Sequence, residues 1–250
     1  MTFTVIGRCE RTGQTGIGIA TASIAVGGLC PFSTSAGDII TSQAFARPEL
    51  GLLAVRALED GQALSALPAL LAHSDPNLAF RQVAVLRRDG EVWVHSGPQC
   101  RPWCGHQSGR GFAVMGNFLA GRATIDAMHE AFTGNADEVL AERLLRSLEA
   151  GRDAGGQADA QGRPARERSA GLRVVGAGGS PLVHDDAVAP VDLRIDLHES
   201  AVTALRTLWN TCAQVPHYNA LRSSQPDTTP PLGPWEAEHM GDPKPPPVLL

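Results

Sequence analysis

The sequence contains no apolar run close to the roughly 20 residues that a membrane-spanning helix needs. It also lacks the basic stretch followed by an apolar stretch that marks a secretory signal peptide at the start of a chain. Positive charge is scarce, because 21 Lys and Arg stand against 26 Asp and Glu, which gives a formal net charge of -5. That balance argues against nucleic acid and anionic lipid as partners. We therefore expect a cytoplasmic protein that binds neither nucleic acid nor membrane.

Cysteine is too sparse and scattered for a disulfide framework. The five cysteines stand at positions 9, 30, 100, 104 and 212, an odd number without the regular spacing of a disulfide-rich fold. A zinc site of Cys100, Cys104 and His106, as in a metal-dependent hydrolase, is an alternative interpretation. It is disfavoured, because a Cys-x-x-Cys pair that could complete the site is missing and His106 follows Cys104 by only two residues. We expect reduced thiols, no metal and no cofactor.

Alternating apolar residues predict antiparallel strands joined by short turns. The opening stretch TFTVIGRC-ERTGQ-TGIGIATAS has the pattern of a hairpin over residues 2–23. QVAVLRRDGEVWVHSG has the pattern of a second hairpin that turns at Asp89 and Gly90. Further strands are expected in the segments GDIITSQAF, GFAVMGN, SAGLRVVGAGG and VDLRIDL.

Helical periodicity separates these groups of strands. Pro48 stands at an expected helix start, Pro68 predicts a kink or a late start, and Asn135 is a candidate N-cap. The predicted helices cover about residues 49–60, 63–74, 123–132, 136–151 and 199–212. Residues 152–168 are rich in Gly, Ala and Arg without a period, which predicts a mobile loop.

The order of these elements is strands, two helices, strands, two helices, strands and one helix. Such segregation favours an α+β domain in which two stacked sheets carry helices on both outer faces. We expect this domain to cover residues 1–214. Residues 215–250 contain half of the 18 prolines and few aliphatic residues, so they predict an extended C-terminal tail.

Several segments, in order along the chain, carry a resemblance to a known family. They are MTFTVIGR, AVGGLCPFSTSAGDIITSQAFARPELG, CRPWCGHQSGRGFAVMGNFLAG, RSAGL and VDLRIDLH. Together they resemble the bacterial and archaeal family called domain of unknown function 1028, over about residues 2–209. That family is similar to the N-terminal-nucleophile (Ntn) hydrolases. The resemblance therefore implies their four-layer αββα sandwich and a hydrolase that acts on amide bonds.

This chain departs from the family pattern at several positions. Arg47 stands where Asn is usual, Leu50 where Tyr is usual, and Met115 and Arg168 each where Gln is usual. Cys104 replaces the usual Ala, which further disfavours a zinc site. Because the departures fall near the expected pocket, they predict a substrate preference of this chain's own.

Thr2 is the candidate nucleophile that the resemblance implies. A small second residue allows methionine aminopeptidase to remove Met1, which leaves Thr2 with a free α-amine. Such an amine has an ordinary pKa near 8 and can accept the proton of the threonine hydroxyl as the hydroxyl attacks an amide carbonyl. The alternative is that Thr2 only begins a β-strand.

Two further residues are candidates for the catalytic set. Asn117, in the motif Met-Gly-Asn, suits an oxyanion donor, since a side-chain amide stabilises a tetrahedral intermediate without titrating; a capping role after the strand is the alternative. His106 is a candidate acid–base or substrate-contacting group, with a structural role as the alternative.

Four residues are candidates for substrate binding: Gln43, Arg47, Arg168 and Ser169. Either arginine could hold a substrate carboxylate through its two-pronged guanidinium, or be a solvated surface side chain. The leading hypothesis is an Ntn-type amidohydrolase acting on a small amide or a modified amino acid. The alternative is a non-catalytic protein of the same fold that binds a small molecule. In either case we expect a homo-oligomer.

Overall fold

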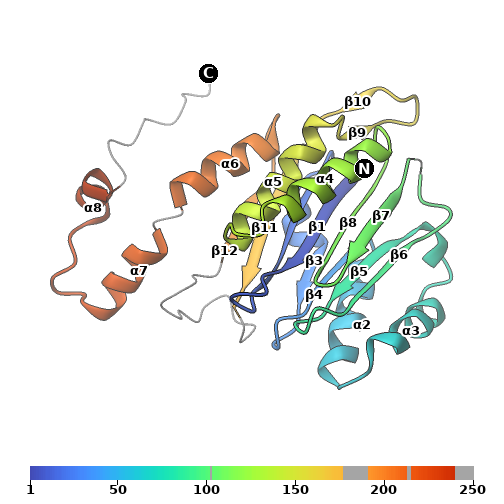
Figure 1. The fold of residues 1–250 in the computed structure, drawn as a ribbon, viewed down its shortest axis with the longest axis horizontal. Helices are drawn as coiled ribbons and strands as arrows, with labels where there is room; N and C mark the ends of the chain where they lie inside the picture. The colour runs from blue at the N-terminus through green and yellow to red at the C-terminus, as the bar shows by residue number, and fades with distance from the viewer. Residues whose placement is uncertain (102, 177–190, 213–214, 240–250) are drawn as a thin grey trace. The chain divides into compact units, whose positions relative to one another are not determined.

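The computed structural model describes the chain except for residues 102, 177–190, 213–214 and 240–250. The chain divides into two compact units, Met1–Leu205 and Arg206–Leu250. The first unit combines helices with antiparallel sheets (Figure 1), so the α+β class predicted from the order of elements is confirmed. No helix among the described residues is long and apolar enough to cross a membrane.

The larger sheet has six strands in the order β12-β11-β2-β1-β8-β7, and every neighbouring pair is antiparallel. Its strands are β1 (Thr2–Arg8), β2 (Thr15–Thr21), β7 (Gly105–Gly109), β8 (Phe112–Asn117), β11 (Ser169–Val175) and β12 (Val191–Ile195). β1 and β2 form the first predicted hairpin. In its register, Thr2 lies opposite Thr21 and Arg8 lies opposite Thr15.

The smaller sheet has four strands in the order β3-β4-β5-β6. Its strands are β3 (Pro31–Ser33), β4 (Ile39–Gln43), β5 (Gln82–Leu86) and β6 (Val92–Ser96). β5 and β6 form the second predicted hairpin. Gly90 in its turn has a φ of 93°, a left-handed conformation that glycine adopts without a Cβ clash.

Alternation along the strands gives each sheet two apolar faces. Ile39 packs in one cluster with Ile6 and Ile17, which belong to the larger sheet. The next residue, Ile40, points to the opposite face and packs with Ala54 and with other helical side chains. The two sheets therefore share an apolar core between them, and the smaller sheet buries a second apolar face against helices.

Helices cover the outer face of the larger sheet. α4 (Arg122–Gly134) packs against β7 and β8, and α5 (Leu140–Asp153) packs against β1, β2 and β11. Close packing depends on Gly7 in β1, because a Cβ at that position would lie 2.3 Å from the Phe132 ring of α4. Asn135 does not cap α5 as predicted, since α5 begins at Leu140 with Val139 as its N-cap. Asn135 instead ends α4, where its side chain donates a hydrogen bond to the Ala131 carbonyl.

Two helices cover the smaller sheet. α2 (Pro48–Glu59) packs against β3 and β4, and α3 (Leu67–Ser74) packs beside α2. Pro48 and Pro68 both stand in the first turn of their helix, where the missing N–H costs no hydrogen bond. Of the two effects predicted for Pro68, the late helix start is therefore correct.

Several further elements connect or follow the two sheets, and all of them except the helix after β12 are short. They are α1 (Val26–Leu29), the 3₁₀ turns Leu64–Ala66 and Leu78–Phe80, β9 (Gln157–Ala158), β10 (Pro164–Ala165) and α6 (Ala201–Cys212). β9 and β10 pair within the segment 152–168 that was predicted as a loop without regular structure. An isolated bridge also joins Leu119 to Gln157.

The second unit contains helices where the proline content predicts extended chain. α7 (Val215–Ser224) and α8 (Leu232–His239) fall within the predicted tail, and Tyr218 of α7 contacts Trp235 of α8 with 5.1 Å between ring centroids. Pro216 stands in the first turn of α7, a position that tolerates proline. Residues 240–250 of the predicted tail lie outside the described residues.

Candidate functional site

A row of polar residues crosses the larger sheet at one end of its strands. Ser169, Thr21, Thr2 and Asn117 are successive register partners on β11, β2, β1 and β8. Each is the first or last residue of its strand, and all four are buried, with Thr2 the most exposed at 6%. The fold therefore places the two catalytic candidates Thr2 and Asn117 directly beside each other.

A second polar row crosses the smaller sheet. Gln43, Gln82 and Ser96 are register partners on β4, β5 and β6 and again stand at strand ends. Both glutamines are fully buried. A buried amide without a hydrogen-bond partner destabilises the fold. The amides of Gln43 and Gln82 therefore need partners inside the protein, and these partners connect the two rows.

Gln82 joins the two rows. Its Oε1 accepts hydrogen bonds from Asn117 Nδ2 at 3.1 Å and from Gln43 Nε2 at 2.9 Å. Gln43 Oε1 in turn accepts the Thr4 hydroxyl of β1 at 2.6 Å. Thr2 lies two residues before Thr4 on the same strand, so its side chain points to the same face, toward the smaller sheet.

The amide nitrogen of Gln82 extends the network toward His106. Gln82 Nε2 lies within hydrogen-bond distance of three acceptors: Ser96 Oγ at 2.8 Å, the Gly116 carbonyl at 3.0 Å and the Gly105 carbonyl at 3.2 Å. Ser96 Oγ is 2.9 Å from His106 Nδ1. A continuous path of hydrogen bonds therefore connects Asn117 to His106.

The hydroxyl of Thr2 pairs with that of Thr21 at 3.1 Å. Thr21 also donates to the carbonyl of Met1, so Thr2 is the donor in the pair of hydroxyls. Burial lowers the pKa of the Met1 α-amine, an effect that the nearby Cys30 thiol partly opposes. Asn117 Oδ1 is buried and has no hydrogen-bond partner among the described residues. Asn117, which lies beside Thr2, therefore has an amide oxygen that is available to accept a hydrogen bond.

Strained backbone follows both rows. Phe118, directly after Asn117, has a φ of 52°, and Ala44 and Phe45, directly after Gln43, have φ values of 56° and 49°. A left-handed conformation costs a non-glycine residue about 1–2 kcal/mol, and such strain concentrates at functional sites. The residues that directly follow Asn117 and Gln43 are therefore held in conformations that the local sequence does not favour.

Two of the four predicted substrate-binding residues support the chain around Thr21. Ser169 Oγ donates to the Ser23 carbonyl at 3.0 Å and accepts from the Val26 amide at 3.1 Å. The backbone amide of Arg168 donates to the Thr21 carbonyl at 2.7 Å. The Arg168 side chain is exposed. Ser169 thus belongs to the polar row, whereas Arg168 touches it only through its backbone.

Arg47 lies in an ion-pair network and not in the polar rows. Its guanidinium is 3.1 Å from the carboxylate of Asp75, which also pairs with Arg81 at 2.9 Å. Arg81 in turn donates to the carbonyl of the strained Phe45. In this arrangement Arg47 supports the chain after Gln43.

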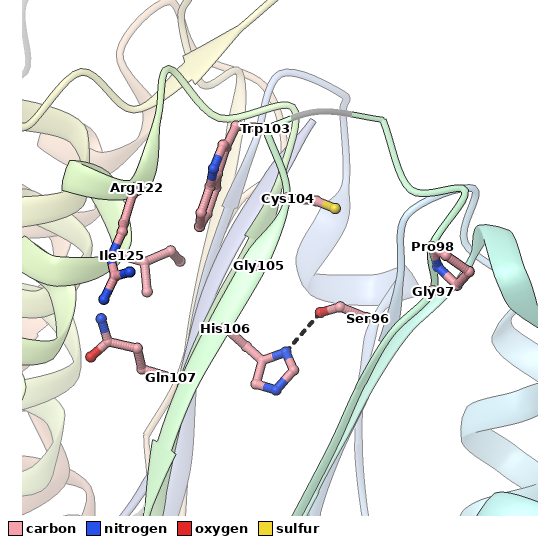
Figure 2. Close-up of a pocket in the computed structure, with 10 residues that line it drawn as sticks. All are labelled: Ser96, Gly97, Pro98, Trp103, Cys104, Gly105, His106, Gln107, Arg122 and Ile125. Atoms are coloured by element: carbon pink, nitrogen blue, oxygen red, sulfur yellow. Dashed lines mark hydrogen bonds between the residues drawn. The ribbon is translucent and has the colours of Figure 1, made fainter.

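His106 lies in a pocket of about 390 Å³ on the edge strand β7 (Figure 2). The pocket is lined by Ser96, Gly97, Pro98, Trp103, Cys104, Gly105, His106, Gln107, Arg122 and Ile125. Partial burial lowers the pKa of His106, and the neighbouring His95 lowers it further, so both effects favour the neutral ring. The structure therefore places His106 in a pocket that is connected to Asn117 through the side chains of Ser96 and Gln82.

The cysteines near this pocket are thiols that burial makes less acidic. Burial raises the pKa of Cys100 to about 11, and it also raises the pKa of Cys104. The Cys104 thiol donates to the carbonyl of Cys100 at 3.6 Å. Across the described parts of the chain, no group of three or more His, Cys, Asp or Glu residues is arranged to hold a metal ion.

Comparison with known proteins agrees with this architecture. A family of unknown function, DUF1028, matches residues 2–205. The chain belongs to the DUF1028 family. This DUF1028 chain is similar to the crystal structure of protein SPO2555 from Silicibacter pomeroyi, of the same family, with 27% sequence identity and a TM-score of 0.71. The match covers 85% of this chain and 89% of that one. Among curated proteins, none matches the chain.

Sequence reasoning missed the central residue of the site. Gln82 begins a strand whose other residues are all apolar, and Thr21 ends β2, a buried strand whose other polar residue is Thr15 at the opposite end. An isolated polar residue at the end of a buried strand was the available signal, because such a side chain needs partners inside the protein. The partners themselves lie on other strands, so the sequence alone did not identify them.

Proposed function

We propose that this chain is an amidohydrolase of the Ntn type, with the hydroxyl of Thr2 as nucleophile after removal of Met1 in the cytoplasm. The single observation that supports the proposal best is the position of Thr2 between Thr21 and Asn117, at the buried start of β1. The two sheets with their helices are consistent with the four-layer αββα sandwich of Ntn hydrolases, which we include in the proposal.

The proposed reaction begins with the attack of Thr2 Oγ on the carbonyl carbon of the substrate amide. The hydroxyl proton passes to the neutral α-amine of Thr2, and the carbonyl π electrons move onto the oxygen. Collapse of the tetrahedral intermediate breaks the C–N bond as the α-ammonium protonates the leaving amine. Water then hydrolyses the acyl ester on Thr2 with the same amine as base, which releases the acid.

Burial supports the role of the α-amine as base. The amine of Met1 already has a lowered pKa because it is desolvated. In the mature protein the amine belongs to Thr2, which is only 6% exposed, so desolvation would again favour the neutral form. The unpartnered Oδ1 of Asn117 would provide an acceptor for an N–H of this amine.

Thr21 and Asn117 would act on either side of Thr2. Loss of Met1 removes the carbonyl that Thr21 now binds, so the Thr21 hydroxyl becomes available to orient Thr2. The Nδ2 group of Asn117 uses one hydrogen for Gln82 and retains a second. That hydrogen would stabilise the oxyanion of the tetrahedral intermediate.

The test is a screen of small amides with wild type, Thr2→Ala and Thr2→Ser. Intact mass first establishes that Met1 is absent from all three. We expect turnover by wild type, reduced turnover by Thr2→Ser and none by Thr2→Ala. Thr133→Ala is the matched control, because Thr133 is an exposed threonine of α4. Retention of Met1, or equal turnover by wild type and Thr2→Ala, would contradict the proposal.

A further inference from the structure

The pocket on β7 presents hydrogen-bond donors. We propose that it binds a small carboxylic acid with a second acceptor oxygen, such as an N-acyl amino acid, with the carboxylate at Arg122 and the second oxygen at His106. This binding site is independent of catalysis. Only its coupling to Asn117, argued below, rests on the proposed function.

The hydrogen bonds of Ser96 favour one of the two neutral tautomers of His106. Gln82 Nε2 can only donate, so Ser96 Oγ accepts from it at 2.8 Å. Among the described residues, the acceptor within reach of the Ser96 hydrogen is His106 Nδ1 at 2.9 Å, and we assign the bond in that direction. With Nδ1 as the acceptor, the neutral ring carries its proton on Nε2. No partner of Nε2 exists among the described residues, so His106 offers an N–H donor to a ligand.

Arg122 supplies the donor for the carboxylate. Its Nε lies 3.4 Å from each carboxylate oxygen of Asp126, whereas its two Nη groups have no partner within the described part of the chain. Gln107 also donates to Asp126. The carboxylate of Asp126 is therefore shared between the neutral amide of Gln107 and the cationic guanidinium of Arg122. The free Nη groups form the fork that matches a carboxylate.

Trp103 supplies a flat wall on the Arg122 side of the strand. A Cβ at Gly105 would lie 2.5 Å from the Trp103 ring, so the indole packs directly on the backbone of β7. Figure 2 shows Trp103, Gln107 and Arg122 on one side of this strand and His106 with Ser96 on the other. A ligand that crosses the strand would therefore meet Arg122 and the aromatic surface of Trp103 on one side and the His106 donor on the other.

The path from the pocket to Asn117 has a single direction. Asn117 Nδ2 donates to Gln82 Oε1, Gln82 Nε2 donates to Ser96 Oγ, and Ser96 donates to His106. A ligand oxygen on His106 Nε2–H continues the chain in the same direction. Because hydrogen bonds in a chain polarise one another, occupancy of the pocket would reinforce the orientation of Asn117 beside Thr2.

Binding is tested in full-length Thr2→Ala protein, which would not turn over a substrate. The probe is N-acetylglycine, and N-acetylglycinamide is the matched compound without a carboxylate. NMR titration follows the Trp103 indole N–H and the His106 ring. We expect both to shift with N-acetylglycine, and Arg122→Gln to weaken that binding about three- to tenfold while changing N-acetylglycinamide binding by less than about twofold. Absence of binding, or equal effects on both compounds, would overturn the site.

The coupling is tested with Ser96→Ala, and Ser108→Ala on the same edge strand serves as the control. With each protein saturated by the probe at its own affinity, we expect the side-chain amide resonance of Asn117 to shift in the control protein and to remain still in Ser96→Ala. A shift of equal size in both proteins would overturn the coupling. Binding of the probe with no hydrolysis by wild-type protein would count against the proposed function and leave the binding site intact.

Discussion

Thr2 and Asn117 lie directly opposite each other across β1 and β8, with both side chains buried and on the face toward the smaller sheet. Asn117 is held by Gln82, whose Oε1 also accepts the amide of Gln43. One glutamine of the smaller sheet therefore determines how the polar residues of the larger sheet are presented.

Replacement of Gln82 by Met should destabilise the protein markedly. The variant keeps the side-chain volume but leaves the buried amides of Asn117 and Gln43 without their acceptor. We expect the free energy of unfolding to fall by about 2–4 kcal/mol, since each unsatisfied buried group costs about 1–3 kcal/mol. Urea unfolding measures the change. Gln161→Met, at an exposed position, should change stability by less than about 0.5 kcal/mol, and equal effects would show that Gln82 is not central.

The pH dependence of stability should report on Asp75. Burial alone would raise the pKa of this carboxyl, but hydrogen bonds from Arg81 and from the Asn77 amide, with the charges of Arg81 and Arg47, bring it below the ordinary value of 3.8. Because the pKa is lowered in the folded state, the carboxylate stabilises the fold above the ordinary pKa. That stabilisation is lost as the pH falls through the lowered value.

Asp75→Asn should therefore be less stable than wild type by about 2–3 kcal/mol at neutral pH. The difference should stay constant from about pH 7 to about pH 5 and shrink below about pH 4, as wild type itself becomes protonated. Urea unfolding at each pH measures it, with Asp60→Asn as the exposed control. If the difference in stability between wild type and Asp75→Asn grew as the pH fell, the pKa of Asp75 would not be lowered in the folded state.

Replacement of Ala25 by Gly should stabilise the protein. Ala25 has a φ of 56°, and glycine removes the clash of its Cβ in that conformation, with a gain of up to about 1 kcal/mol. Ala131→Gly, in the interior of α4, should instead lower the free energy of unfolding by about 1 kcal/mol. Thermal unfolding of both variants provides the comparison. A lower midpoint for Ala25→Gly than for wild type would show that this turn is not strained.

Local patterns allowed most of the scaffold to be predicted. The hairpin β1–β2 follows from alternation and the turn after Arg8, and α2 follows from Pro48 and an apolar stripe. The start of α5 was misplaced, because Asn135 satisfies its side chain at the end of α4 instead. β7 was not predicted, since Gly105–Gly109 has little β propensity and forms a strand only through pairing with β8.

The candidate site could be predicted only in part, because it also depends on pairing between distant strands. Thr2, Asn117, Gln43 and Ser169 were candidates from the sequence, and the fold places all four in the two polar rows. Gln82 was missed because its importance comes from partners on other strands. Arg47 was assigned to substrate, whereas its contacts are with Asp75 and the Ser74 carbonyl. Pairing between distant strands decides such roles, and a single sequence does not contain that information.

The most direct measurement is mass spectrometry of the protein after reaction with an activated ester such as 4-nitrophenyl acetate. If Thr2 is the nucleophile, intact mass shows loss of Met1 and one added acetyl group. Peptide mapping then places the acetyl group on Thr2 as an ester that hydroxylamine removes. The Thr2→Ala protein should carry no such ester, and the Thr133→Ala control should react like wild type. Retention of Met1, or an acetyl group that forms equally in Thr2→Ala, would contradict the account.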